Sequence, residues 1–366
     1  MTVTQPGPPV PTAALPKAVR VGPVSLVWRP TVVLAAAVLA VAAVALFCVD
    51  IAVGSTTLPL GRVVDVLAGG GSRAQRYIVL ESRLPRAATG VVVGMALGLA
   101  GALTQSVLHN PLAAPDVLGI GSGAGLGAVT VLAGSGASTG FAVSIGAPIA
   151  AVLGGLGTAA VIYVLAWGRH PGAGAGATGI RLVLLGVGVN SLLLAGINWQ
   201  LARAELTDIT RTQRWLIGSL DEATRATLVP AAVALAVVVL VAVCSAHTLA
   251  TLRLDTDTTR MLGVRLRSQQ ALLIGAAVVA VSVATAAVGP IEFVGLIAPQ
   301  VARRMLRTAG EPLIGSALAG AVVVLGADIL ARVLLPVDLP VGIVTAALGG
   351  PFLLVLLVFI TRKATL

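Results

Sequence analysis

The amino-acid sequence predicts an all-α polytopic membrane protein with about ten transmembrane helices. Two observations carry this prediction. Of the 366 residues, 57% are hydrophobic and 10% are charged, a balance far from that of soluble globular domains. The apolar residues also gather in repeated runs of roughly 20, the length that crosses the hydrocarbon core of a bilayer as a helix.

The first 28 residues differ in composition from the rest of the chain. They contain several prolines, Lys17 and Arg20, and they have no apolar run before Val24. A secretory signal would need a long apolar segment and a cleavage site, and neither is recognisable. We therefore predict a disordered cytoplasmic tail over residues 1–28 and a ten-helix transmembrane domain over residues 29–366.

Ten runs after the tail are predicted as membrane spans. The eighth is short, and the glycine-rich third permits a different division. The runs cover residues 31–50, 87–108, 117–134, 142–167, 180–201, 227–250, 269–289, 291–303, 312–334 and 340–360.

The second span carries a stripe of glycines after the arginine pair Arg83 and Arg86. Gly94, Gly98 and Gly101 follow the spacing i, i+4, i+7, which places them near one face of a helix. Glycine lets helix backbones approach closely, and close packing drives helix association in lipid. Packing within the bundle is the simpler interpretation of the stripe, and a direct role in a transport pathway is the alternative.

Four polar side chains within the spans are expensive to expose to lipid. We expect them to face the protein interior or a cavity. They are Gln105, Asn190, Asn198 and Gln200.

Several classes of function find no support in the sequence. No G-x-x-x-x-G-K-[ST] motif is present, so the chain does not bind ATP through a P-loop of its own. The alternating glycines between residues 119 and 127 do not satisfy G-x-G-x-x-G. The three histidines are scattered, and Cys48 and Cys244 fall inside apolar spans, so we predict no metal site, no disulfide and no resident cofactor. No arrangement of catalytic residues indicates an enzyme.

The net charge of +10 reflects membrane orientation rather than a nucleic-acid partner. With a cytoplasmic N-terminus, the cytoplasmic segments hold 14 of the 24 basic residues and the four acids Asp116, Asp255, Asp257 and Glu311, which gives 14 − 4 = +10. The external segments then hold 10 basic and 10 acidic residues. Orientation follows the excess of basic residues, so both termini are predicted to be cytoplasmic.

The loop over residues 252–270 mixes acids and arginines around Met261 and Gly263. A short amphipathic helix that ends at Gly263 fits this pattern, because glycine readily adopts a left-handed cap. Such a helix outside the membrane would offer an apolar ridge to a partner protein. A charged loop that only serves membrane orientation is the equal alternative.

A set of short motifs resembles the FecCD family of permease subunits, which belong to ABC importers of iron-siderophore complexes, haem and cobalamin. The resemblance covers nearly everything between about residues 30 and 360. Its motifs, in order, are Arg83-Leu84-Pro85-Arg86, Asn110-Pro111-Leu112-Ala113, Leu118-Gly119, Gly121-Ser122-Gly123-Ala124, Leu262-Gly263-Val264, Gly289-Pro290-Ile291-Glu292-Phe293-Val294-Gly295-Leu296, Ala298-Pro299 with Arg303-Arg304, Ala327-Asp328-Ile329-Leu330-Ala331-Arg332, and Leu339-Pro340-Val341-Gly342-Ile343-Val344-Thr345.

The resemblance implies the type II ABC importer permease fold, in the bacterial cytoplasmic (inner) membrane. It also implies the partners: a second homologous permease subunit, two cytoplasmic ABC ATPase domains and an extracytoplasmic substrate-binding protein. ATP and Mg²⁺ would then belong to the partner ATPase, which accounts for the missing P-loop.

Site roles also follow from the resemblance. Arg83, Arg86 and Arg332 match arginines that pair with glutamates of the binding protein, a role that suits the bidentate guanidinium group. Asn110 and Leu112 match a cytoplasmic gate. The residues that match the coupling segment held in a cleft of the ATPase are Thr259, Arg260, Leu262, Gly263 and Val264.

Three departures from the family pattern stand out. Gln300 replaces a usual histidine, Glu292 replaces a small residue, and the segment 349–353 varies the usual Gly-Ala-Pro-Phe-Phe. Glu292 would either contact a cationic or metal-bearing substrate or, more commonly, pair with a nearby arginine.

The last expectations concern the imported substrate and the pairing of two permease chains. We expect Fe(III)-siderophore import by a heterodimer of permease chains, with cobalamin or haem as the alternative cargo. An ATP-independent secondary transporter or channel is the alternative from another class, and it would predict paired carboxylates embedded in the spans. Such pairs are almost missing from the predicted spans.

Overall fold

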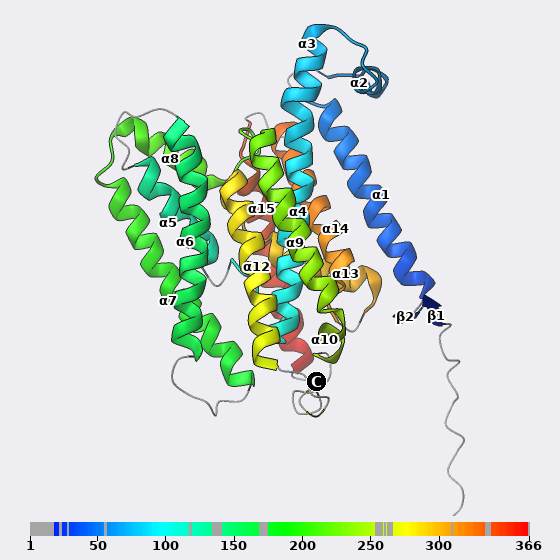
Figure 1. Cartoon of the computed structure of the whole chain (residues 1–366), viewed down its shortest axis with the longest axis vertical. Coiled ribbons are helices and arrows are strands. Elements are labelled where there is room, and N and C mark those ends of the chain that lie inside the picture. Colours follow the sequence, from blue (N-terminus) through cyan, green and yellow to red (C-terminus); the bar gives the residue numbers. More distant parts are fainter. Residues whose placement is uncertain are drawn as a thin grey trace, which may run out of the picture.

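A computed structural model describes most of the chain as a bundle of long helices (Figure 1). The described residues are 18–21, 24–27, 29–54, 57–116, 119–133, 141–167, 175–252, 259, 261, 266–308, 310–333 and 338–364. The elements are β1 (Ala18–Val21), β2 (Val24–Val27), α1 (Pro30–Ala52), α2 (Leu60–Leu67), α3 (Arg73–Arg76), η1 (Tyr77–Arg83), α4 (Leu84–Leu108), α5 (Ile120–Leu132), α6 (Phe141–Trp167), α7 (Ala175–Leu201), α8 (Leu206–Ile217), α9 (Arg225–Cys244), α10 (Ala246–Thr251), α12 (Leu266–Val288), α13 (Val294–Leu306), α14 (Leu313–Val333) and α15 (Val341–Ala364).

The predicted fold class is confirmed. Within the described residues, eight helices are long and apolar enough to cross a membrane, and α5 is a shorter apolar helix. Each of the ten predicted spans corresponds to a helix whose ends lie within a few residues of the expected ones. The sixth span is the exception in detail, because its predicted range is divided at Ser245 between α9 and α10.

Several short elements were not expected from the apolar runs. Two strands, β1 and β2, pair antiparallel inside the segment that the sequence predicts to be a disordered tail. They are rich in valine, which favours extended backbone. The helices α2, α3 and α8 lie outside the spans; α2 and α3 rise above one end of the bundle (Figure 1).

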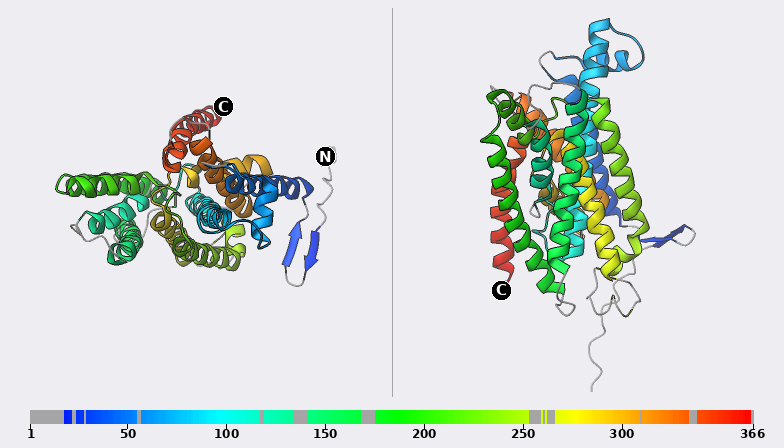
Figure 2. Two further views of the ribbon diagram at one scale, coloured as in Figure 1. Left: turned by 90° about the horizontal axis from the view of Figure 1, so that it is seen from above. Right: turned by 60° about the vertical axis from the view of Figure 1, so that its left-hand side comes forward.

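Helix α4 lies in the middle of the bundle, where it contacts α1, α7, α9, α12, α13 and α14 (Figure 2). The glycine stripe makes these contacts close. A Cβ atom added to Gly94 or Gly98 would overlap the backbone of α14, and one added to Gly101 would overlap Gly295 at the start of α13. The packing interpretation of the stripe is therefore confirmed.

The alternating glycines of α5 have a similar use. Gly123 and Gly127 face α6, where an added Cβ would overlap backbone at Gly154 and Ala150. Close packing of α5 on α6 therefore accounts for the glycine-rich run of α5. Together, α5, α6, α7 and α8 form one side of the molecule, and α1 forms the opposite flank (Figure 1).

Candidate functional site

A break in helical geometry ends at the first of the two arginines that begin the second span. Residues Arg73–Leu108 form one continuous helix, but Tyr77–Arg83 is a π-helical turn. Pro85 explains the wide turn, because proline lacks an N–H and its ring clashes with the carbonyl group of residue i−4 in a regular α-helix. Single π-turns inside α-helices occur often at functional sites.

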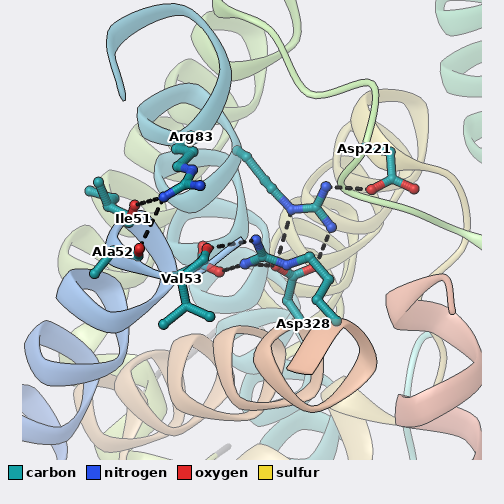
Figure 3. A network of polar contacts seen from close by, with 9 residues as sticks. Ile51, Ala52, Val53, Arg83, Asp221 and Asp328 are labelled. Carbon is teal, nitrogen blue, oxygen red and sulfur yellow. Dashed lines mark hydrogen bonds and ion pairs between the residues drawn. The ribbon is translucent and has the colours of Figure 1, made fainter. Parts of the chain in front are cut away.

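Arg83 is turned toward the end of α1. Its Nη1 atom donates to the carbonyl oxygens of Ile51 and Ala52, each at 3.0 Å, as Figure 3 shows. These carbonyl groups belong to the last turn of a helix, where they have no partner within the helix and carry partial negative charge. Arg83 therefore caps α1 and is itself buried.

Arg332, in the last turn of α14, completes the attachment of α1. It pairs with Asp50 and also donates to the carbonyl oxygen of Val53 at 3.3 Å. The Asp50 side chain is fully buried, so this guanidinium group supplies the compensation that a buried carboxylate requires.

Asp328 joins Arg332 to Arg86. Its carboxylate accepts two bonds from Arg86, at 3.1 and 2.7 Å, and lies 2.8 Å from Nη2 of Arg332. Arg86 also pairs with Asp221, which follows α8 and whose side chain is 65% exposed. Burial alone would raise the pKa of Asp221, but the hydrogen bond and charge of Arg86 outweigh burial and lower that pKa.

We call these six residues the arginine cluster: Arg83, Arg86, Arg332, Asp50, Asp221 and Asp328. Figure 3 labels Arg83, Asp221 and Asp328 among them. The cluster joins α1, α4, α14 and the segment after α8 at one end of the bundle, which we call the arginine end. The structure thus brings the three predicted docking arginines together. All three have partners within the chain, and the side chains of Arg86 and Arg332 are only 15% and 14% exposed.

The two predicted gate residues lie in the turn after α4. Oδ1 of Asn110 accepts the backbone N–H of Leu112 at 2.9 Å, a local bond that replaces helical pairing and helps to end the helix. His109, the C-cap residue of α4, has a left-handed backbone, and its Nε2 atom lies 2.6 Å from the carbonyl oxygen of Leu252.

A buried chain of hydrogen bonds supports this turn. Nε2 of Gln300 donates to Oε1 of Gln105 at 2.6 Å and to the carbonyl oxygen of Pro111 at 3.3 Å. Oε1 of Gln300 accepts a hydrogen bond from Nη2 of Arg303 at 3.0 Å. Nη1 of Arg303 in turn donates to Oε1 of Glu311 at 3.2 Å. Gln300 and Gln105 are both almost fully buried.

Leucine in place of Gln300 is expected to destabilise the protein. The substitution leaves the buried Oε1 of Gln105 without its donor, a loss of about 1–3 kcal/mol, while Arg303 keeps its ion pair with Glu311. Histidine can still donate and accept and is expected to retain most of that stability. Thermal unfolding of the detergent-purified protein distinguishes the two; equal melting temperatures for Gln300→Leu and the parent chain would contradict this role.

The other predicted polar side chains vary in their surroundings. Gln105 is buried, and Gln200 donates to Thr130 at 2.9 Å. Asn198 is exposed on α7, so the expectation that it faces the interior of this chain is wrong.

A cavity of about 210 Å³ lies beside the predicted gate. Asp116 and Glu292 both line it, together with Leu112 and Asn190. Asp116, which the sequence analysis assigns to a cytoplasmic segment, lies against the bundle, and its Oδ2 atom is buried. The common expectation that Glu292 pairs with an arginine is not met, since no ion pair links them within the described part of the chain.

Little of the predicted coupling segment falls within the described residues. Thr259 is buried and donates to the carbonyl oxygen of Thr251 at 2.8 Å. Met261 is 87% exposed. Arg260, Leu262, Gly263 and Val264 lie outside the described residues.

Sequence reasoning missed the acidic half of the arginine cluster. Asp328 and Arg332 are four residues apart on one helix, a spacing that favours ion pairs and could have revealed one contact. No such signal connects Asp50 to Arg332, which are 282 residues apart in the chain.

Comparison with known proteins agrees with this architecture. The family model described as the FecCD transport family matches residues 31–359. The chain is 36% identical over 312 residues to the ferric enterobactin transport system permease protein FepG of Escherichia coli K12, covering 85% of this chain and 91% of FepG.

Two further relatives and one solved structure are similar. FepD, the other ferric enterobactin permease protein of E. coli K12, is 33% identical, with 86% of this chain and 90% of FepD covered. The hemin permease protein HmuU of Yersinia pestis is 32% identical, with 77% and 83% covered. A structure described as a metal-chelate type ABC transporter superposes with a TM-score of 0.75 at 24% identity, covering 88% of this chain and 98% of that one.

Proposed function

Since this chain belongs to the FecCD transport family and is a permease subunit of an ABC importer of the siderophore, haem and iron group, we propose that its cargo is an Fe(III)-siderophore complex. The similarity to FepG over most of both chains carries this proposal. The subunit has no catalytic activity of its own, and import is driven by a separate ATPase. Haem is the second candidate, because HmuU is similar over most of its length.

Uptake by a deletion strain tests the cargo. Iron-starved cells that lack this gene are supplied with iron-labelled siderophores, haemin or cobalamin, and are then complemented with the gene. Loss and recovery of uptake of at least one ferric siderophore is the expected result. Loss confined to haemin or cobalamin would contradict the proposal.

A second permease chain completes the proposed pathway. FepG and FepD are two permease proteins that share the name of one transport system, and both resemble this chain. This supports a heterodimer. Affinity purification of the tagged subunit from native membranes is expected to recover a second FecCD-type chain and an ABC ATPase.

We place the arginine end on the external face, where it receives the substrate-binding protein. The supporting observation is that Arg83, Arg86 and Arg332 all belong to the arginine cluster. Because Asp221 is exposed and pairs with Arg86, a glutamate of the binding protein can exchange with it, while Asp328 keeps its own contact.

Removing the competing carboxylate is therefore expected to strengthen docking. Asp221→Asn should tighten binding-protein association by about 2- to 5-fold, the range of one exposed ion pair. Glu222→Gln makes the same change of charge one residue away at another exposed position and serves as the control. Association is measured with the purified transporter in nanodiscs; equal affinities for both variants would contradict docking at Arg86.

Transport then proceeds by alternating access. The cavity beside Asn110 and Leu112 lies next to the proposed pathway, and the turn that these residues form is the proposed gate on the cytoplasmic side. ATP binding closes the partner ATPases, which move the coupling segment around Gly263. Each conformation must bind a different partner more tightly, because a ligand shifts an equilibrium only by its differential affinity.

A further inference from the structure

Two carboxylates share the cavity beside the proposed gate. Asp116 lies in the connection between α4 and α5, and Glu292 lies in the connection between α12 and α13. They are close enough for their charges to repel each other. Asn190 of α7 and the buried Thr285 of α12 add an amide and a hydroxyl group to the lining.

The cavity lies between the two ends of the bundle. Gly295, at the start of α13, packs against Gly101 and Pro115. At the rise of an α-helix, Gly101 is about 22 Å along α4 from Arg86 and about 10 Å from the other end of that helix. The neighbouring carboxylates of Asp116 and Glu292 therefore lie between the two ends of α4.

Within the described part of the chain, this pair has no compensating cation. Neither Asp116 nor Glu292 takes part in an ion pair there. The buried Oδ2 of Asp116 and the buried Oδ1 of Asn190, on a separate helix, also have no hydrogen-bond partner. Glu292 is exposed, whereas Oδ2 of Asp116 is buried, and a buried carboxylate is costly unless a positive group or hydrogen bonds compensate its charge. Three oxygen-bearing side chains thus converge on the same unfilled space.

The size and lining of the cavity indicate the kind of cation. Its 210 Å³ falls below the roughly 300–1,000 Å³ of pockets that enclose a whole drug-sized ligand. It has room for a side group with several atoms. Phe293 also lines the cavity, and its backbone is left-handed, which is unusual for a bulky residue.

We propose that this cavity binds an organic ammonium group carried by the imported chelate. Asp116 and Glu292 supply the negative charge, and Asn190 accepts a hydrogen bond from the ammonium group. The inference rests on the proposed function, because it assumes a chelate as cargo. It assigns a positively charged substrate class to this permease.

Charged thiol reagents test the cavity without any knowledge of the substrate. Ser122, which lines the cavity, is changed to cysteine in a Cys48→Ser, Cys244→Ser chain. The assembled transporter then reacts with methanethiosulfonates that carry either trimethylammonium or sulfonate. The measured quantity is the reaction rate with the trimethylammonium reagent divided by the rate with the sulfonate reagent. At Ser122→Cys this ratio is expected to be about tenfold higher than at Ser72→Cys, an exposed control, because a carboxylate-lined cleft concentrates cations.

The same measurement in an Asp116→Asn, Glu292→Gln chain is expected to return the ratio to the Ser72→Cys value. A ratio that these two substitutions leave unchanged would overturn the proposal. Failure of both reagents to react at Ser122→Cys would also overturn it, because the cavity would then be closed to charged solutes.

Uptake of two matched chelates tests the substrate class. One is a ferric trihydroxamate with a free primary amine, and the other is its N-acetylated form. Faster uptake of the amine form, with the preference lost in the Asp116→Asn, Glu292→Gln chain, is expected. Equal uptake by the parent transporter would overturn the substrate class. If no ferric chelate enters at all, the proposed cargo fails, while the reagent ratio still decides whether the cavity attracts cations.

Discussion

Leucine in place of Gly101 is expected to prevent the permease from folding into its native bundle. Gly101 packs directly against the backbone of Gly295, so a side chain there cannot be accommodated by a change of rotamer. Overpacking in a close-packed interior costs about 1–3 kcal/mol when side chains can adjust, and more when the obstacle is backbone. Helix α4 touches six other helices, so its displacement disrupts most of the bundle.

Fluorescence-detected size-exclusion chromatography of a tagged chain measures this effect. Gly275→Leu in α12 is the matched control, because a Cβ atom there meets nothing within 4 Å. The control should give a monodisperse peak like that of the parent, whereas Gly101→Leu should give aggregate or no protein. A normal peak for both would mean that the packing of α4 on α13 is not required.

Asparagine in place of Asp328 is expected to have the second-largest effect. The buried carboxylate neutralises parts of two guanidinium groups, on Arg86 and Arg332. Removing one partner from a buried ion pair costs about 3–5 kcal/mol, because the remaining charge stays buried. The loss should appear as a lower melting temperature and as faster proteolysis of the segment that joins α1 to α2.

An exposed ion pair is the appropriate comparison. Glu81 and Arg225 pair at 3.2 Å, but their side chains are 54% and 66% exposed. Glu81→Gln should therefore change stability by less than about 1 kcal/mol. If Asp328→Asn is no less stable than Glu81→Gln, the arginine cluster does not hold α1, α4 and α14 together.

The sequence predicted the spans well because their signal is local. A run of apolar residues and its flanking glycines or charges fall within one segment, so α1 begins one residue before the predicted range and α14 ends one residue before it. The π-turn at Tyr77–Arg83 depends on Pro85 inside a helix that continues past it, and a proline there usually indicates a helix start.

The site was less predictable because its contacts are not local. From the sequence, Asp116 is predicted to be a charge in a loop. Only the folded structure brings it to the same cavity as Glu292. Asp116 and Glu292 lie in connections between helices, so they differ from the paired carboxylates within spans that would indicate a secondary transporter, and the chain belongs to an ABC permease family. The pair therefore has to be explained by the cargo or by the cavity rather than by a change of class.

The charge balance of the arginine cluster has a kinetic consequence. Its three arginines and three aspartates have balancing formal charges, although Arg83 contacts backbone carbonyl groups rather than a carboxylate. A neutral patch exerts little attraction beyond the Debye length of about 8 Å at physiological ionic strength. If the binding protein docks there, its association rate should depend weakly on salt, and recognition should act through the lifetime of the complex, after the two surfaces have met.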